Sequence, residues 1–352
     1  MTAAESNQDA NPVPKIKLTP SAIVAYLNQH VIGQNDAKRA LAVVVYTHFK
    51  NLAAAQSDAH LPSRSDKVTL GKSNVLLVGP TGTGKTLLCE TLSRAISVPF
   101  VTADATSLAQ TKYVNEEIEA ILLRLINKAG GNLQRASRGI VFIDEIDKLK
   151  AAGANAPGTS GENVQHALLK IMEGSLVKLT GGITIDTANI LFICGGAFVG
   201  LEDVIANGKA YGFISLTDAS KQLILDRLNS RVKPTDLIAY GLIPEFTGRL
   251  PVVTSLEPLS KDMLVKIMTE PTHSLYNQFR EILEREGVTL EIAPRVFDEI
   301  ASLAVEYKVG ARSLRGIFEE MIAPVLYVVP DRSDIKRVEI KSLFEEAILH
   351  IA

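Results

Sequence analysis

The sequence has few of the residues that form metal or redox sites. Among 352 residues there are two cysteines, six histidines and no tryptophan. Cys89 and Cys194 lie within apolar segments and form no Cys-x-x-Cys pair, so we expect two buried thiols in a reducing, cytoplasmic environment. The histidines are scattered without metal-ligand spacing, which argues against a zinc site.

A strong charge of one sign is also absent. The chain has 37 Lys+Arg against 39 Asp+Glu, so it lacks the basic excess typical of proteins that bind nucleic acid. No apolar run is long enough to span a bilayer and no secretory signal begins the sequence, so we expect no membrane association. What the chain does have is 46% hydrophobic residues, enough for the cores of about two domains.

Residues 79–86 contain the full pattern of a phosphate-binding loop, Gly-Pro-Thr-Gly-Thr-Gly-Lys-Thr. An apolar strand is predicted before it and a helix after it, so bound phosphates would lie at a helix N-terminus. We expect Lys85 to reach the β- and γ-phosphates of a nucleotide and the Thr86 hydroxyl to bind Mg²⁺. The expected nucleotide-binding residues of this segment are Gly79, Pro80, Thr81, Gly82, Thr83, Gly84, Lys85, Thr86 and Leu87.

Two carboxylates follow a second apolar strand. Residues 140–143 are all apolar and precede Asp144 and Glu145, at the strand end where open α/β sheets bind ligands. We expect Asp144 to hold Mg²⁺ and Glu145 to polarise the water that attacks the γ-phosphate. An acidic cap between a strand and a helix is the alternative, and the phosphate loop favours hydrolysis over it.

The order of predicted elements indicates a large α/β domain followed by a smaller, mostly helical one. Residues 1–16 are expected to be a disordered leader, 17–256 the α/β domain with a mainly parallel sheet in three layers, and 257–352 the small domain. In the large domain, Ser21 and Asn35 are expected to cap helices that run to about His30 and Leu52. Its strands are predicted near 73–78, 99–103, 139–143 and 189–194. The small domain is predicted to have helical segments near 260–286, 294–306 and 312–328, and strands near 288–292 and 336–340.

Further segments, together with the phosphate loop, resemble the ClpX family of AAA+ ATPases. The resemblance runs from Leu18 to the end of the chain and implies an AAA+ fold with a large α/β domain and a small helical domain. The segments that carry it are 31–34 and 37–46 at the adenine-binding opening, 160–170 after the second pore loop, 191–198 after the fourth core strand, 241–251 at the arginine finger and 310–315 at the second sensor.

The resemblance implies a homohexameric ring with ATP between subunits. Val31 and Ile32 would flank the adenine with apolar surface. Arg249 would act in trans on the neighbour's γ-phosphate, and Arg312 in cis, where it reports the nucleotide state to the small domain. Taken without the resemblance, both arginines are typical of exposed surface side chains.

Such rings pull polypeptide substrates through a central pore. The resemblance places the gripping aromatic at Tyr113 with Val114 beside it, and an aromatic ring can hold any chain by contact area. In the family the chain then passes to a ClpP-type peptidase. The docking tripeptide of the peptidase corresponds to Tyr211, Gly212 and Phe213.

The sequence departs from the family pattern mainly on surfaces that contact other proteins. It has no four-cysteine set for the family's N-terminal zinc module, and Lys112 and Asn115 replace the glycines of the first pore loop. The second pore loop, near 150–159, lacks the usual arginine. A tight hairpin around 181–182 replaces a basic loop, and Tyr211 replaces an isoleucine of the docking tripeptide. No polar first sensor can be assigned within 194–196.

Three functions therefore stay open. The favoured one is an unfoldase that works with a peptidase, which the apolar Phe213 supports. The altered tripeptide supports a peptidase-independent remodeller with a specific client. A nucleotide-gated scaffold or DNA-associated protein is the third, and Glu145 and the charge balance argue against it. Because the recognition surfaces differ, we also expect poor handling of the degradation tags typical of the family.

Overall fold

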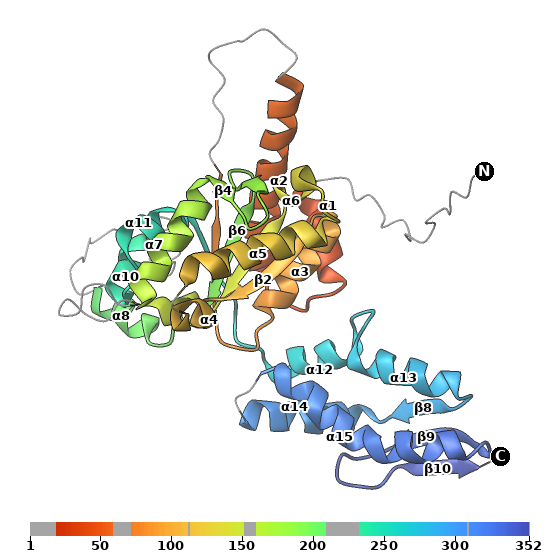
Figure 1. Ribbon diagram of the computed structural model, residues 1–352. Coiled ribbons are helices and arrows are strands. Elements are labelled where there is room, and N and C mark those ends of the chain that lie inside the picture. Colours follow the sequence, from red (N-terminus) through yellow and green to blue (C-terminus); the bar gives the residue numbers. More distant parts are fainter. Residues whose placement is uncertain are drawn as a thin grey trace, which may run out of the picture.

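The computed structural model describes residues 19–58, 72–111, 113–150, 160–208, 232–307 and 310–351 (Figure 1). The larger part of the chain is built on a five-stranded parallel sheet with strand order β2-β3-β6-β1-β7. Its strands are β1 (Val75–Val78), β2 (Phe100–Asp104), β3 (Ile140–Asp144), β6 (Leu191–Gly196) and β7 (Val252–Ser255). The four predicted strands are present, whereas β7 was not predicted.

Helices cover both faces of this sheet. Successive residues of a strand point to opposite faces, so neighbouring residues pack against different helices. Val75 and Leu77 pack with the first group of helices, while Leu76 and Val78 pack with the second. The first group is α1 (Pro20–Asn28), α2 (Asn35–Asp58) and α3 (Lys85–Ala95). The second is α4 (Ala105–Gln110), α5 (Val114–Lys128), α6 (Leu133–Ala136), α7 (Ser160–Glu173), α8 (Leu201–Gly208), α10 (Pro234–Tyr240) and α11 (Pro244–Gly248), together with the 3-10 turn η1 (Ile146–Leu149). The predicted three-layer α/β architecture is confirmed.

The observed starts of the first two helices can be compared with the predicted ones. α1 starts two residues earlier than expected: Thr19 Oγ1, not Ser21, accepts the capping hydrogen bond, from the Ala22 N–H at 3.3 Å. Pro20 occupies the first helical position, where its missing N–H has no cost. α2 begins at Asn35 itself, so Asn35 is its first residue and not the cap that was expected, and the helix continues past Leu52 to Asp58.

The hairpin predicted around residues 181–182 is also present. β4 (Leu176–Lys178) and β5 (Thr184–Asp186) pair antiparallel. The Gly181 and Gly182 φ angles are +85° and +77°, in the left-handed region that favours glycine. Leu179 and the turn close the hairpin, because the Leu179 N–H donates to the Ile183 carbonyl at 2.7 Å.

The C-terminal part of the chain has its own core and lies beyond one edge of the large sheet (Figure 1). Its helices are α12 (Lys261–Thr269), α13 (Leu275–Arg285), α14 (Pro294–Glu306) and α15 (Arg312–Val328), followed by the 3-10 turn η3 (Val329–Asp331). A three-stranded sheet of β8 (Thr289–Ile292), β9 (Ile335–Ile340) and β10 (Ile348–Ile351) covers them. The helical pattern predicted over 260–286 is two helices, because Pro271 interrupts it.

Some predictions fall on residues outside the described ranges. These are the leader at 1–16, Lys112, most of the second pore loop, and the docking tripeptide of Tyr211, Gly212 and Phe213. Within the described ranges, no helix combines the length and the apolar character needed to cross a bilayer.

Candidate functional site

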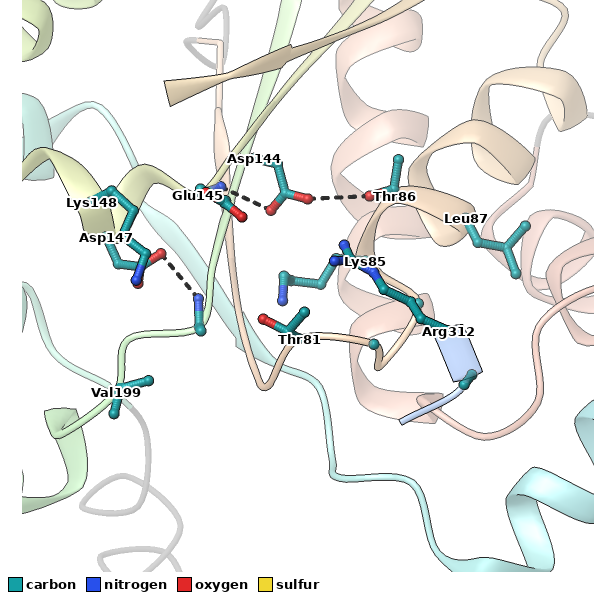
Figure 2. Close-up of a pocket in the computed structure, with 14 residues that line it drawn as sticks. Thr81, Lys85, Thr86, Leu87, Asp144, Glu145, Asp147, Lys148, Val199 and Arg312 are labelled. Carbon is teal, nitrogen blue, oxygen red and sulfur yellow. Dashed lines mark hydrogen bonds and ion pairs between the residues drawn. The ribbon is translucent and has the colours of Figure 1, made fainter. Parts of the chain in front are cut away.

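A cavity of 420 Å³ opens at the C-terminal edge of the large sheet (Figure 2). Its walls come from the phosphate loop, the end of β3, the segment after β6 and the start of α15. Of the predicted site residues, it is lined by Thr81, Gly82, Gly84, Lys85, Thr86, Leu87, Asp144, Glu145 and Arg312. Segments from four parts of the sequence thus meet at the edge where parallel sheets bind ligands.

Lys85 is the cation at the centre of the phosphate loop. It is the first residue of α3, and its side chain is 7% exposed. Its Nζ donates to the carbonyl oxygens of Gly79 and Pro80, at 2.6 and 3.1 Å. Burial lowers the pKa of Lys85, and the Asp144 carboxylate opposes this effect. The ammonium is therefore held inside the loop whose backbone amides would surround a phosphate.

The turn itself depends on glycine. Gly82 and Gly84 have φ angles of +84° and +93°, a region where side chains with a Cβ are strained. Thr83 supports the turn from within, since its Oγ1 donates to the Pro80 carbonyl at 2.8 Å. Gly79, Pro80 and Thr83 form the loop without lining the cavity.

Thr86 and Asp144 lie side by side and both line the cavity (Figure 2). Thr86 Oγ1 donates a hydrogen bond of 3.3 Å to Asp144 Oδ2. A hydroxyl and a carboxylate are hard oxygen ligands of the kind that Mg²⁺ takes, usually with waters completing the octahedron. The two side chains therefore fit a magnesium ion bound through few protein groups.

Glu145 has a constrained backbone and a held carboxylate. Its φ of +58° lies in the left-handed region, a conformation that is uncommon for a residue with a Cβ. The Glu145 N–H donates to Asp144 Oδ1 at 2.9 Å, and Thr106 Oγ1 donates to Glu145 Oε2 at 2.9 Å. Sequence reasoning missed Thr106, which lies on α4 and belongs to no motif that the sequence analysis used.

Asp147 is a second residue that sequence reasoning missed. It is 3% exposed, lines the cavity, and accepts a hydrogen bond of 3.1 Å from the Ala197 N–H. A Cβ at Gly196 would lie 2.6 Å from Asp147 Oδ1, so this last position of β6 requires glycine. Asp147 thus joins the end of β3 to the segment where no polar first sensor could be assigned.

The two predicted arginines occupy different places. Arg312 is the first residue of α15 and lines the cavity. Arg249 follows α11 and does not line the cavity. Its side chain is 52% exposed and pairs with Glu173 at 2.6 Å. Glu173 had not been predicted as its partner.

The remaining predicted residues that the structure describes do not line the cavity. Val31 is 5% exposed and packs with the helices on its own face of the sheet, and neither it nor the half-buried Ile32 lines the cavity. Tyr113 precedes α5 and is 65% exposed. Val114 is half-buried and packs against the large core.

Two family models match the chain, one on each part. Residues 71–253 match an AAA domain of the Cdc48 subfamily. Residues 259–340 match the C-terminal, D2-small domain of the ClpB protein. A protein of Bacteroides thetaiotaomicron described as the ATP-dependent Clp protease ATP-binding subunit ClpX is 45% identical over 329 residues, 89% of this chain and 78% of the relative. The chain belongs to the ClpX family.

Relatives of the same description occur in other bacteria. A ClpX of Bacteroides fragilis is 45% identical to this ClpX-family protein over 336 residues, 91% of the chain and 79% of the relative. A ClpX 3 of Methylococcus capsulatus is 43% identical over 346 residues, 92% of the chain and 79% of the relative. Membership of this AAA family makes the protein an ATP-binding ATPase, as predicted.

Proposed function

We propose that this ClpX-family protein is an ATP-driven unfoldase and translocase that works as a homohexameric ring. In this proposal ATP is hydrolysed in the 420 Å³ cavity, and a polypeptide moves through the central pore of the ring. The observation that carries the proposal is the short connection between Glu145 in the cavity and Tyr113, the residue proposed to grip the polypeptide. The helix α4 bears Thr106, which contacts Glu145, and ends three residues before the exposed Tyr113.

The side chains of the cavity divide the chemistry of phosphoryl transfer between them. Lys85 and Arg312 offset the negative charge on the transferred phosphoryl group. Glu145 orients the attacking water and accepts a proton from it. Thr86 and Asp144 would hold Mg²⁺, which when bound neutralises charge on the β- and γ-phosphates.

Arg249 completes the site of a neighbouring subunit in this proposal. Its exposure and its absence from the lining of its own cavity support a role in trans. The position of Val31 and Ile32 near the adenine stays a proposal that rests on the family resemblance, as does the magnesium-bound nucleotide between subunits.

A ClpP-type peptidase is the proposed partner. The relatives' description as ATP-binding subunits of the Clp protease supports it. The docking tripeptide at 211–213 lies outside the described residues, and its departure from the family pattern keeps a stand-alone remodeller as the second candidate.

The deciding experiment mixes the purified protein and ATP with a ClpP peptidase and an unstructured fluorescent protein substrate. Degradation that requires ATP and is lost in Phe213→Ala would establish the protease-partnered unfoldase. Glu145→Gln serves as the control, since it should bind ATP without hydrolysing it and degrade nothing. ATP hydrolysis by the wild type without degradation would favour the remodeller.

A further inference from the structure

The loop between α1 and α2 contacts the small C-terminal part of the chain through two side chains of that part. His30 stacks on His273, with ring centroids 6.5 Å apart and planes at 13°. Gly33 lies against Met263, because a Cβ at Gly33 would lie 2.2 Å from Met263 Cε. The loop is therefore a joint between the two parts as well as a connection between helices.

A third contact is made at the junction itself. Gln34 binds the backbone of Glu257, where the chain passes from β7 into the small part. The Glu257 N–H donates to Gln34 Oε1, and Gln34 Nε2 donates to the Glu257 carbonyl, both at 2.8 Å. Gln34 is 4% exposed, so water cannot easily replace either bond. A buried amide that satisfies both backbone groups of one residue fixes the position and the orientation of that residue.

The junction between the two parts, residues 256–257, also contacts the phosphate loop and the strand before it. The Leu256 N–H donates to the Val78 carbonyl at 2.7 Å. A Cβ at Gly79 would lie 2.7 Å from the Leu256 carbonyl oxygen, so the first residue of the loop is in close contact with the junction. Residues 256–257 are thus held between the phosphate loop and Gln34.

The loop that carries Gln34 is itself anchored to the large part. Lys38 is 1% exposed, and its Nζ donates to Asn28 Oδ1 at 2.8 Å and to the Val31 carbonyl at 2.5 Å. Asn28 is the last residue of α1, and Val31 lies within the same loop. Lys38 therefore holds the loop from the large side while Gln34 holds the junction.

Arg312 gives this arrangement a consequence for the reaction. It belongs to α15, whose buried residues pack in the small core, yet it lines the cavity of the large part. The orientation of the small part therefore decides where the guanidinium lies relative to Lys85 and Glu145.

We propose that Gln34 is a positioning residue that fixes the junction at Glu257 and thereby places Arg312 over the phosphate loop. This inference rests on the role proposed above for Arg312. Gln34 does not line the cavity. Its loss should therefore reduce turnover rather than ATP affinity.

The kinetic test compares Gln34→Glu with the wild type in steady-state ATP hydrolysis. A carboxylate oxygen would then face the Glu257 carbonyl, which removes one bond and adds repulsion. We expect kcat to fall about 10-fold and KM to change less than about 2-fold. In the Arg312→Ala background the same change should cost less than about 2-fold, since the effects of residues that act through one another are not additive. A raised KM with normal kcat, or full additivity with Arg312→Ala, would overturn the proposal.

A structural test does not depend on hydrolysis. Fluorescent labels at Gln134→Cys on α6 and Glu286→Cys after α13 report the distance between the two parts, and both native cysteines are buried. We expect Gln34→Glu to shift or broaden the energy-transfer distribution. If the Gln34→Glu variant does not fold, Gln34→Met replaces it in this test, since methionine keeps the side-chain length and removes both hydrogen bonds. A distribution identical to that of the wild type would overturn the proposal.

Gln165 provides the matched control. It is also a fully buried glutamine with both functions bonded to backbone: Nε2 donates to the Leu149 carbonyl at 2.7 Å, and Oε1 accepts from the Ile243 N–H at 2.9 Å. These contacts lie within the large part. Gln165→Glu should therefore lower thermal stability to a similar degree and leave the distribution unchanged. An equal shift in both variants would mean that any buried charge disturbs the junction, and the role of Gln34 would be refuted. If wild-type ATPase activity fails to depend on Arg312, the proposed site is wrong, whereas the distribution still tests Gln34.

Discussion

Thr106 donates a hydrogen bond of 2.9 Å to Glu145, and this bond links α4 to the carboxylate proposed to activate water. Asp104 fixes the start of α4, because its Oδ1 accepts from the Thr106 N–H at 2.7 Å. The same helix leads through Thr111 to the exposed Tyr113. A displacement of Tyr113 therefore has a covalent and hydrogen-bonded route to the carboxylate of Glu145.

We expect Thr106→Val to lower kcat for ATP hydrolysis about 10-fold with little change in KM, because an unheld carboxylate is misplaced for general base catalysis. Valine keeps the shape of threonine and removes the hydroxyl. Thr106→Ser, which keeps the hydroxyl, should retain most of the activity. The measurement is steady-state phosphate release, and a Thr106→Val variant with wild-type kcat would show that the bond does not serve catalysis.

Arg249 should act on a neighbouring subunit. Arg249→Ala and Glu145→Gln are each expected to lower kcat by about 100-fold or more, because each removes a group that acts on the transferred phosphoryl. When the two inactive variants are mixed in equal amounts, about a quarter of the sites in a ring should combine an intact Glu145 with an intact neighbouring Arg249.

The mixture should therefore recover ATPase activity that neither variant has alone. Two Arg249→Ala preparations mixed together are the control and should stay inactive. A mixture without recovery, from subunits that still assemble, would place the action of Arg249 within its own chain. Removal of the Glu173 pair by Glu173→Gln should leave thermal stability nearly unchanged, because the pair is about half exposed.

The residues of contiguous motifs could be located from the sequence. The phosphate loop and the Asp144–Glu145 pair are local patterns between a strand and a helix, and the edge of a parallel sheet brings them together. Sequence patterns could not reveal partners from other segments. Thr106 meets Glu145, and Glu173 meets Arg249, only because the sheet order places distant segments side by side.

The strand β7 and the cap of α1 were missed because their local sequence patterns are weak or ambiguous. β7 has only four residues, follows Pro251, and its burial is only partial, so it lacks the continuous apolar run that predicted the other core strands. The cap of α1 was placed at Ser21 because serine, like threonine, can fill that role. The backbone geometry at Thr19 decided between them.

Both cysteines should be unreactive in the native protein. Burial raises the pKa of Cys194 to about 12, and burial together with the Asp144 charge raises that of Cys89 well above its usual range. The thiolate is the reactive form, and it appears only as the pH rises through the native pKa. We expect almost no reaction with a thiol-specific disulfide reagent at pH 8, and little acceleration on going to about pH 9.5.

In denaturant the two thiols should react rapidly, with the pH dependence of free cysteine, whose pKa is about 8.5. Absorbance of the released thiolate measures both rates. Rapid modification of one equivalent in the folded protein would mean that the region around Cys89 or Cys194 opens readily. Above about pH 8.5 the unfolded chain loses protons that the native chain keeps, so these thiols should also lower the free energy of unfolding as the pH rises.

Tyr113 should be required for moving a polypeptide and dispensable for hydrolysing ATP. Its side chain is 65% exposed, so Tyr113→Ala should leave thermal stability and kcat for ATP within about 2-fold of the wild type. ATP-dependent unfolding of a fluorescent substrate should be lost, because an alanine offers too little contact area to hold a chain. Tyr113→Phe should keep most of the activity. Tyr327, on α15 and 83% exposed, supplies the control: Tyr327→Ala removes an even more exposed ring, which lies outside the segment around Tyr113, and should unfold substrate normally. Equal loss in both variants would point to a general effect of losing an exposed tyrosine, and normal unfolding by Tyr113→Ala would remove this loop from the path of the substrate.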